Sequence, residues 1–137
     1  MGIREKLGRS KWSGQIEFTI EDRAEDRVVA SMPVQPGIVN SFGTVHAGAM
    51  VWFADVAATL CAIGDVSEVD EDGQNFPLAI DLHTVLMANE RDGTLTATAT
   101  PVRRGQKLTV IRTRVTGQSG HTLIEMTSTH IRAERKA

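Results

Sequence analysis

The chain has 137 residues, of which 41% are hydrophobic and 23% charged, a mixture typical of a globular domain. The formal net charge is -2, which gives no indication of the clustered basic face that a nucleic-acid-binding protein uses to neutralise phosphates. The single cysteine, Cys61, excludes an intrachain disulfide and is expected in the core of a protein from a reducing compartment. We therefore expect one domain over 1–137, with 1–12 as a short helix or a loose arm.

The N-terminal segment 1–10 is charged and lacks the apolar stretch of a signal peptide. Lys6 stands where a myristoylation signal requires Ser or Thr. The longest apolar run, 47–63, is short for a membrane span and carries Asp55 near its middle. These features predict a cytoplasmic protein without a membrane partner.

In chain order, the first elements are two short strands at 15–20 and 27–32, separated by a charged turn at 21–26. Pro33 and the Pro36-Gly37 pair then interrupt regular structure. The run 47–63 is rich in Ala, Met and Leu and predicts a helix, with Gly64 as its C-terminal cap. This helix is apolar on all sides, so a curved sheet and a second subunit are expected to cover it.

An acidic loop at 65–75 precedes segments in which apolar and polar residues alternate, the period of strands. The strands are predicted at 76–87, 94–103, 107–116 and 122–132, with turns at 91–93, 104–106 and 117–120. We interpret them as a four-stranded meander. Antiparallel strands with one segregated helix predict an α+β fold, in which a curved antiparallel sheet wraps around the long apolar helix.

Asp55 is the first candidate for chemistry, because a carboxylate in an apolar helix is costly to bury unless it is paired or neutralised. Burial would raise its pKa towards the range that suits a base or a nucleophile. The structural alternative is that Asp55 reaches solvent or pairs with an arginine of the sheet.

The start of the helix is the second candidate. The first turn of a helix has unpaired N–H groups and a partial positive charge, and the small residues Ala47 and Gly48 leave room for a ligand. Such a site can polarise a carbonyl and stabilise an oxyanion. The alternative is that these small residues only permit tight helix packing.

Helical geometry restricts how these candidates can cooperate. Ala47 and Asp55 are about 12 Å apart along the axis, and His46 and Asp55 about 13 Å, on opposite sides. Two antiparallel helices related by a two-fold axis bring the start of one beside the middle of the other. If the two groups share a site, the protein is at least a dimer.

The pattern Asn40-x-x-Gly43-Thr44-Val45-His46-Ala47-Gly48 followed by Asp55 resembles the signature of hotdog-fold acyl-CoA thioesterases, closest to the phenylacetate-degradation type. The segments 77–82 and 105–108 resemble the family's strand after the helix and its later hairpin. The resemblance implies hydrolysis of acyl-CoA to acid and CoA in a homodimer or homotetramer, with the site at the subunit interface. It implies no metal or bound cofactor.

The resemblance also assigns roles to individual residues. Asp55 would be the nucleophile or general base, and the Ala47 N–H of the other subunit would bind the thioester oxygen. Asn40 would orient substrate or water, and His46 would brace the loop beside Gly48. The family usually has Gly where Ala47 stands, but Ala still supplies the backbone donor.

A second departure from the family concerns the attacking water. Some relatives position it with a Ser or Thr on the strand after the helix, and the corresponding residue here is Ala79. Separately, Arg103, Arg104 and Lys107 cluster at a predicted turn and could contact the phosphates of CoA. The alternative for these cations is a solvated hairpin tip.

Two other functions remain open at this stage. A hotdog dehydratase or hydratase would require His46 to be catalytic, whereas a thioesterase would partly tolerate its loss. A non-catalytic acyl-CoA-binding domain would be consistent with the missing hydroxyl at Ala79. Tight acyl-CoA binding without release of CoA would identify this last case.

Overall fold

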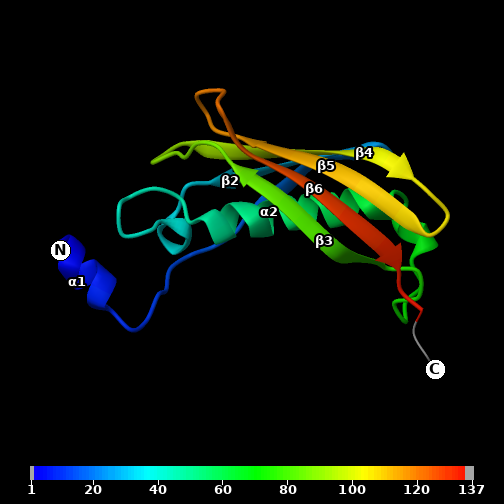
Figure 1. The fold of residues 1–137 in the computed structure, drawn as a ribbon, viewed down its shortest axis with the longest axis horizontal. Helices are drawn as coiled ribbons and strands as arrows, with labels where there is room; N and C mark the ends of the chain where they lie inside the picture. The colour runs from blue at the N-terminus through cyan, green and yellow to red at the C-terminus, as the bar shows by residue number, and fades with distance from the viewer. Residues whose placement is uncertain (1, 135–137) are drawn as a thin grey trace.

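The computed structural model describes residues 2–134 and consists of one sheet, one long helix and a short N-terminal helix (Figure 1). The helices are α1 (Ile3–Gly8) and α2 (Ala47–Ile63), with single 3-10 turns at Pro36–Ile38 and Val66–Glu68. The strands are β1 (Thr19–Ala24), β2 (Arg27–Pro33), β3 (Pro77–Leu86), β4 (Thr94–Arg104), β5 (Leu108–Thr116) and β6 (Thr122–Arg132).

The six strands form one antiparallel sheet in the order β1-β2-β4-β5-β6-β3, which curves over α2 (Figure 1). The expected α+β arrangement of a sheet around one helix is therefore correct. The expected four-stranded meander is wrong for its first strand, because β3 pairs with β6 and not with β4. The loop after β3 returns the chain to the middle of the sheet, and β3 becomes an edge strand.

The first strand also differs from the prediction, which placed a strand at 15–20 and a turn at 21–26. β1 covers Thr19–Ala24, and only Glu25 and Asp26 form the turn to β2. All residues of β1 except Ile20 are exposed, so the strand carries no apolar alternation that would reveal it. Its backbone pairing with β2 holds it in place.

The predicted limits of α2 are confirmed, and Gly64 caps it with a φ of 71°. One face of α2 packs on the sheet and forms the core with buried residues of β2, β4, β5 and β6. The buried residues of this face are Met50, Phe53, Ala54, Ala57, Ala58, Cys61 and Ala62. No helix within residues 2–134 is both long enough and apolar enough to cross a membrane.

The opposite face of α2 stays uncovered in the protomer. Gly48 and Trp52 are exposed there, and Asp55, Val56 and Thr59 are only half-buried. Gly48, Trp52, Asp55 or Val56, and Thr59 follow one another at intervals of three or four residues, so these positions form a single stripe along the helix. This stripe carries the carboxylate that the sequence singled out.

Candidate active site

The loop that leads into α2 is shaped by Asn40. Its Oδ1 accepts hydrogen bonds from the N–H groups of Phe42 and Thr44, at 2.9 and 3.0 Å. Its Nδ2 donates to Thr44 Oγ1 at 2.7 Å, and its backbone N–H to the Thr44 carbonyl at 2.7 Å. An Asn side chain that bonds to the backbone two residues later stabilises a turn without needing a strand or helix partner. Asn40 thus closes the turn at Gly43, whose φ of 82° suits glycine.

A second clamp on this loop comes from the segment between β3 and β4. Asn89 Oδ1 accepts the Val45 N–H at 3.0 Å, and Asn89 Nδ2 donates to the Val45 carbonyl at 2.8 Å. Arg91 Nη1 donates to the Phe42 carbonyl at 2.7 Å. Asn89 could not be identified from the sequence, because its partner is 44 residues away and no local motif marks it.

The clamped loop presents the start of α2 to solvent. His46 is the N-cap residue, and its backbone N–H donates to the Ile38 carbonyl at 2.8 Å. Ala47 and Gly48 are exposed, and neither of their N–H groups has a hydrogen-bond acceptor within residues 2–134. Two free donors on small residues at a helix start can donate to a negatively charged oxygen.

Asp55 lies two turns further along the same helix, half-buried on the open stripe. It lines a shallow hollow of about 350 Å³ together with Val56, Thr59, Leu60 and Phe76. No ion pair to Asp55 occurs among the residues that the structure describes. Of the two structural alternatives, the arginine partner is not observed, whereas the half-buried carboxylate does reach solvent in the protomer, where it borders an apolar hollow.

Beneath Asp55, strand β6 carries a buried polar pair, Ser128 and His130. Ser128 Oγ and His130 Nε2 share a hydrogen bond of 2.8 Å, while His130 Nδ1 has no partner within residues 2–134. Burial lowers the pKa of His130, and the negative charge of Asp55 partly offsets this effect. Ala79 lies opposite His130 in the β3–β6 ladder. Because residue 79 is alanine, this position supplies no hydroxyl group near Asp55.

The three hairpin cations lie at the other end of α2. The Arg104 guanidinium donates from Nη2 to the carbonyls of Cys61 and Glu25, at 2.9 and 2.6 Å, and from Nη1 to that of Ala62, at 3.3 Å. It therefore satisfies carbonyls at the C-terminus of the helix, where a positive charge is favourable. The exposed Arg103 and Lys107 make no such contacts among residues 2–134, and phosphate binding by this cluster stays a prediction.

Burial raises the pKa of the Cys61 thiol, and the charge of Arg104 partly offsets the increase. Cys61 is fully buried, as expected for a core residue. Among residues 2–134, no three His, Cys, Asp or Glu side chains gather in a way that could hold a metal ion. The open face of α2 thus offers a ligand two free N–H groups at its start and the Asp55 carboxylate two turns further along.

Comparison with known proteins identifies the family. Residues 42–124, more than half of the chain, match the family model of the thioesterase superfamily. The chain belongs to the thioesterase superfamily. The matched segment contains the helix start, Asp55 and the hairpin cations, but not Asn40. A search of curated protein sequences found no match.

Solved thioesterase structures share the fold. A thioesterase from Staphylococcus aureus is 25% identical, with a TM-score of 0.75 and coverage of 85% of this chain and 93% of that chain. One from Haemophilus influenzae is 22% identical, with a TM-score of 0.75 and coverage of 85% and 78%. A hypothetical thioesterase protein from Streptococcus pneumoniae, in a structure with coenzyme A, is 20% identical, with a TM-score of 0.75 and coverage of 88% and 89%. The expected hotdog fold is confirmed.

Proposed function

We propose that this thioesterase-superfamily protein hydrolyses acyl-CoA to a free acid and CoA. The observation that carries the proposal is the pair of free N–H groups at Ala47 and Gly48, at the exposed start of the same helix whose open stripe displays Asp55. The donors suit a developing oxyanion, and the carboxylate suits activation of water. The structure of the pneumococcal relative with coenzyme A supports a CoA thioester as the substrate class.

The active site is proposed to form between two copies of the chain. Ala47 and Asp55 are about 12 Å apart along one helix, too far to act on one carbonyl. Strand β3 is an edge strand whose side chains Ile80, Leu82 and Leu86 are 56%, 40% and 55% exposed. An apolar edge strand beside an open helix stripe is an association surface. A two-fold partner would cover both and bring its own Asp55 to the helix start.

The proposed reaction proceeds by general-base catalysis. Asp55 of one subunit takes a proton from water, whose oxygen attacks the thioester carbonyl carbon. The Ala47 N–H of the other subunit stabilises the resulting oxyanion. The C–S bond then breaks, and the departing CoA sulfur receives the proton from Asp55. Direct attack by the carboxylate, with hydrolysis of the resulting anhydride, uses the same groups.

The roles of the neighbouring residues follow from their contacts. Asn40 holds the loop before the helix, and its second Nδ2 hydrogen remains for substrate or water. His46 supports the helix start through its backbone. The apolar hollow beside Asp55 suits an apolar acyl group. The resemblance to the phenylacetate-degradation type makes aryl acyl groups the first to test.

The first experiment measures free thiol release from a panel of aliphatic and aryl acyl-CoA substrates by wild type and by Asp55→Asn. The substitution keeps the size of the side chain and removes its charge. We expect turnover of at least one substrate and a loss of rate of at least about 100-fold in the variant. A folded wild type that releases no CoA from any substrate would contradict hydrolysis.

A complementation experiment tests the shared site. Ala47→Pro removes the backbone donor at the first helical position, where proline is tolerated. The preceding residue His46 already has the extended ψ of 134° that proline requires. Each variant alone should be nearly inactive. Co-refolding equal amounts of Ala47→Pro and Asp55→Asn should restore about a quarter of wild-type activity, because half of the dimers then contain one intact site.

The dehydratase alternative gains no specific support from the structure. His46 makes no side-chain cap hydrogen bond and is nine residues from Asp55 on the same helix. The variant His46→Gln discriminates the two reactions, because it should reduce thioester hydrolysis only partly. A binding-only domain would retain acyl-CoA without releasing free thiol, which the substrate panel detects directly.

A further inference from the structure

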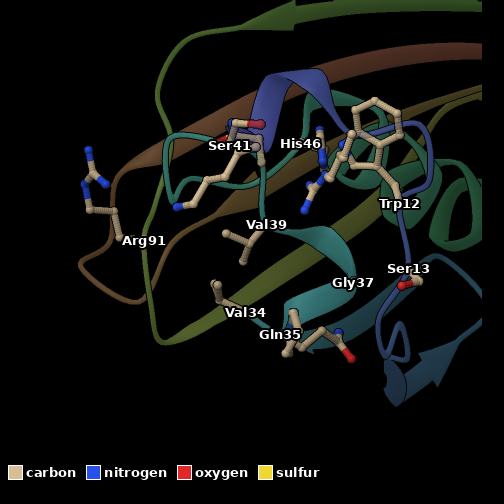
Figure 2. Close-up of a pocket in the computed structure, with 13 residues that line it drawn as sticks. Trp12, Ser13, Val34, Gln35, Gly37, Val39, Ser41, His46 and Arg91 are labelled. Carbon is tan, nitrogen blue, oxygen red and sulfur yellow. The ribbon is translucent and has the colours of Figure 1, made fainter. Parts of the chain in front are cut away.

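A second hollow, of about 470 Å³, opens beside the helix start and shares Asn40 and His46 with the site described above. Its wall includes His46, Arg91, Lys6, Arg9 and Trp12, and Figure 2 shows its lining residues. In this view, Trp12 and His46 lie on one side of the hollow and Arg91 on the opposite side (Figure 2). The volume falls within the range of small-molecule sites in proteins.

The N-terminal arm (residues 2–18) reaches this hollow because its root is bound to the segment before α2. Gln35 Nε2 donates to the Glu17 carbonyl at 2.8 Å, and Gln35 Oε1 accepts the Glu17 N–H at 2.9 Å. The Gly37 N–H donates to the Gln15 carbonyl at 2.9 Å. A Cβ on Gly37 would lie 2.3 Å from that same oxygen, so only glycine permits the approach. These contacts fix the base of the arm, and thereby the direction in which the segment with Trp12 extends from the sheet and α2.

The wall of the hollow is positively charged. Lys6, Arg9 and Arg91 contribute cations, and none of the described residues that line it is acidic. The two ion pairs found among residues 2–134, Arg27–Asp22 and Arg114–Glu125, involve none of them. Arg9 Nε is a buried donor without a hydrogen-bond partner in the described part of the chain. In a chain of net charge -2, such a concentration of cations suits an anionic ligand.

Trp12 adds an aromatic surface. The Arg9 guanidinium lies 5.2 Å from the centre of the Trp12 ring, and Trp12 remains 53% exposed. An exposed aromatic ring flanked by arginine is a stacking platform for a nucleobase, while the neighbouring cations suit phosphates. A ligand with only a carboxylate group would use the cations but would not require the Trp12 ring.

We propose that the N-terminal arm binds the nucleotide end of the CoA substrate, with Trp12 stacking on adenine and Lys6, Arg9 and Arg91 contacting phosphates. This inference rests on the proposed function for its choice of ligand. The hollow begins at His46, next to the Ala47 N–H, so the pantetheine chain of a thioester held at the helix start can lead into it. The hairpin cations, by contrast, lie at the far end of α2, although a two-fold partner would bring its own hairpin closer.

The experiment measures the affinity for adenosine 3′,5′-bisphosphate, which carries the nucleotide end of CoA without a thioester, by calorimetry. Arg9→Ala and Trp12→Ala should each weaken binding about tenfold. Gly37→Ala, which displaces the root of the arm, should weaken it as well. The matched control is Arg23→Ala, which removes an exposed cation beside Gly64, near the other end of α2. Circular dichroism checks that each variant is folded.

Kinetics then separate the nucleotide from the acyl group. For acyl-CoA, the arm variants should raise KM about tenfold with kcat unchanged, and for the matching acyl-pantetheine they should change neither constant. Equal losses on both substrates would assign the hollow to the acyl group and overturn the proposal. The proposal would also be overturned by weak binding of the nucleotide to wild type or by unchanged nucleotide affinity in the arm variants. A loss of nucleotide affinity confined to Arg103→Ala and Lys107→Ala would overturn it as well. Wild type could fail to hydrolyse any substrate while the arm variants still lose nucleotide binding. In that case the proposed function fails, but the nucleotide site stands.

Discussion

Ala79 on β3 lies directly opposite His130 on β6, and both residues are neighbours in the sheet beside the helix that carries Asp55. The family resemblance predicts a water-positioning hydroxyl at position 79, and the residue opposite it on β6 is the buried His130. His130, which shares a hydrogen bond with Ser128, is therefore the polar residue that pairs with position 79 across the β3–β6 ladder.

Restoring a hydroxyl at this position should increase the rate. We expect Ala79→Thr to raise kcat about 2- to 10-fold, since one additional hydrogen bond to the attacking water contributes about 0.5–1.5 kcal/mol. The matched control is Ala79→Val, because valine has nearly the shape of threonine without the hydroxyl, and it should not accelerate hydrolysis. Equal effects of the two substitutions would mean that side-chain volume, and not the hydroxyl, is responsible.

The buried imidazole of His130 should titrate at a lower pH than an exposed histidine. Burial lowers its pKa below the ordinary value of 6.5, so as pH falls the unfolded state binds the proton first. The contribution of His130 to stability is therefore complete above pH 6.5 and decreases as pH falls towards the folded-state pKa. Its slope is at most about 1.4 kcal/mol per pH unit. NMR titration measures the pKa directly, and urea unfolding at several pH values measures the slope.

Two neighbouring arginines of the β4–β5 hairpin should differ in their effects on stability. Arg104→Ala removes the donors to the carbonyls of Cys61, Ala62 and Glu25 and should reduce the free energy of unfolding by about 1–3 kcal/mol. Arg103→Ala, at an exposed side chain, should change it by less than about 0.5 kcal/mol. Urea denaturation compares the two. Equal losses would show that Arg104 does not stabilise the helix terminus.

The two functions proposed for Asn40 can be separated by Asn40→Asp. Aspartate keeps the oxygen that accepts the Phe42 and Thr44 N–H groups, so the melting temperature should stay close to that of wild type. It removes the amide donor, so kcat/KM should fall about tenfold if that donor orients substrate or water. Asn40→Ala should reduce both stability and activity. Full activity in Asn40→Asp would mean that Asn40 stabilises the loop and does not orient substrate or water.

The edge strand provides a test of dimerisation. Leu82→Glu places a charge on the exposed side of β3, where it should prevent association and abolish hydrolysis while the protomer stays folded. Val102→Glu, at another exposed apolar residue, is the control and should leave the oligomeric state unchanged. Analytical ultracentrifugation reports the mass of each variant. An active Leu82→Glu monomer would mean that one chain contains the whole site.

The sequence by itself determined the elements with strong local signals. The apolar run and Gly64 defined both ends of α2, because a helix terminus depends on residues within one turn. The limits of the four strands after residue 76 were predicted to within one residue. Strands β4, β5 and β6 each have one buried face, which produces the alternation of apolar and polar residues. The helix-start pattern and Asp55 also indicated the family before any fold was known.

Only the tertiary structure decided relationships between distant segments. Strand β3 joins β6 at an edge, Asn89 clamps Val45, Arg104 bonds to the helix carbonyls and Gln35 holds the N-terminal arm. None of these pairings has a local signal, because strand pairing and long-range side-chain contacts depend on how the whole chain packs. The sequence therefore identified the candidate reactive groups. The packing of the whole chain determined which of them are exposed at an open site and which stabilise the fold.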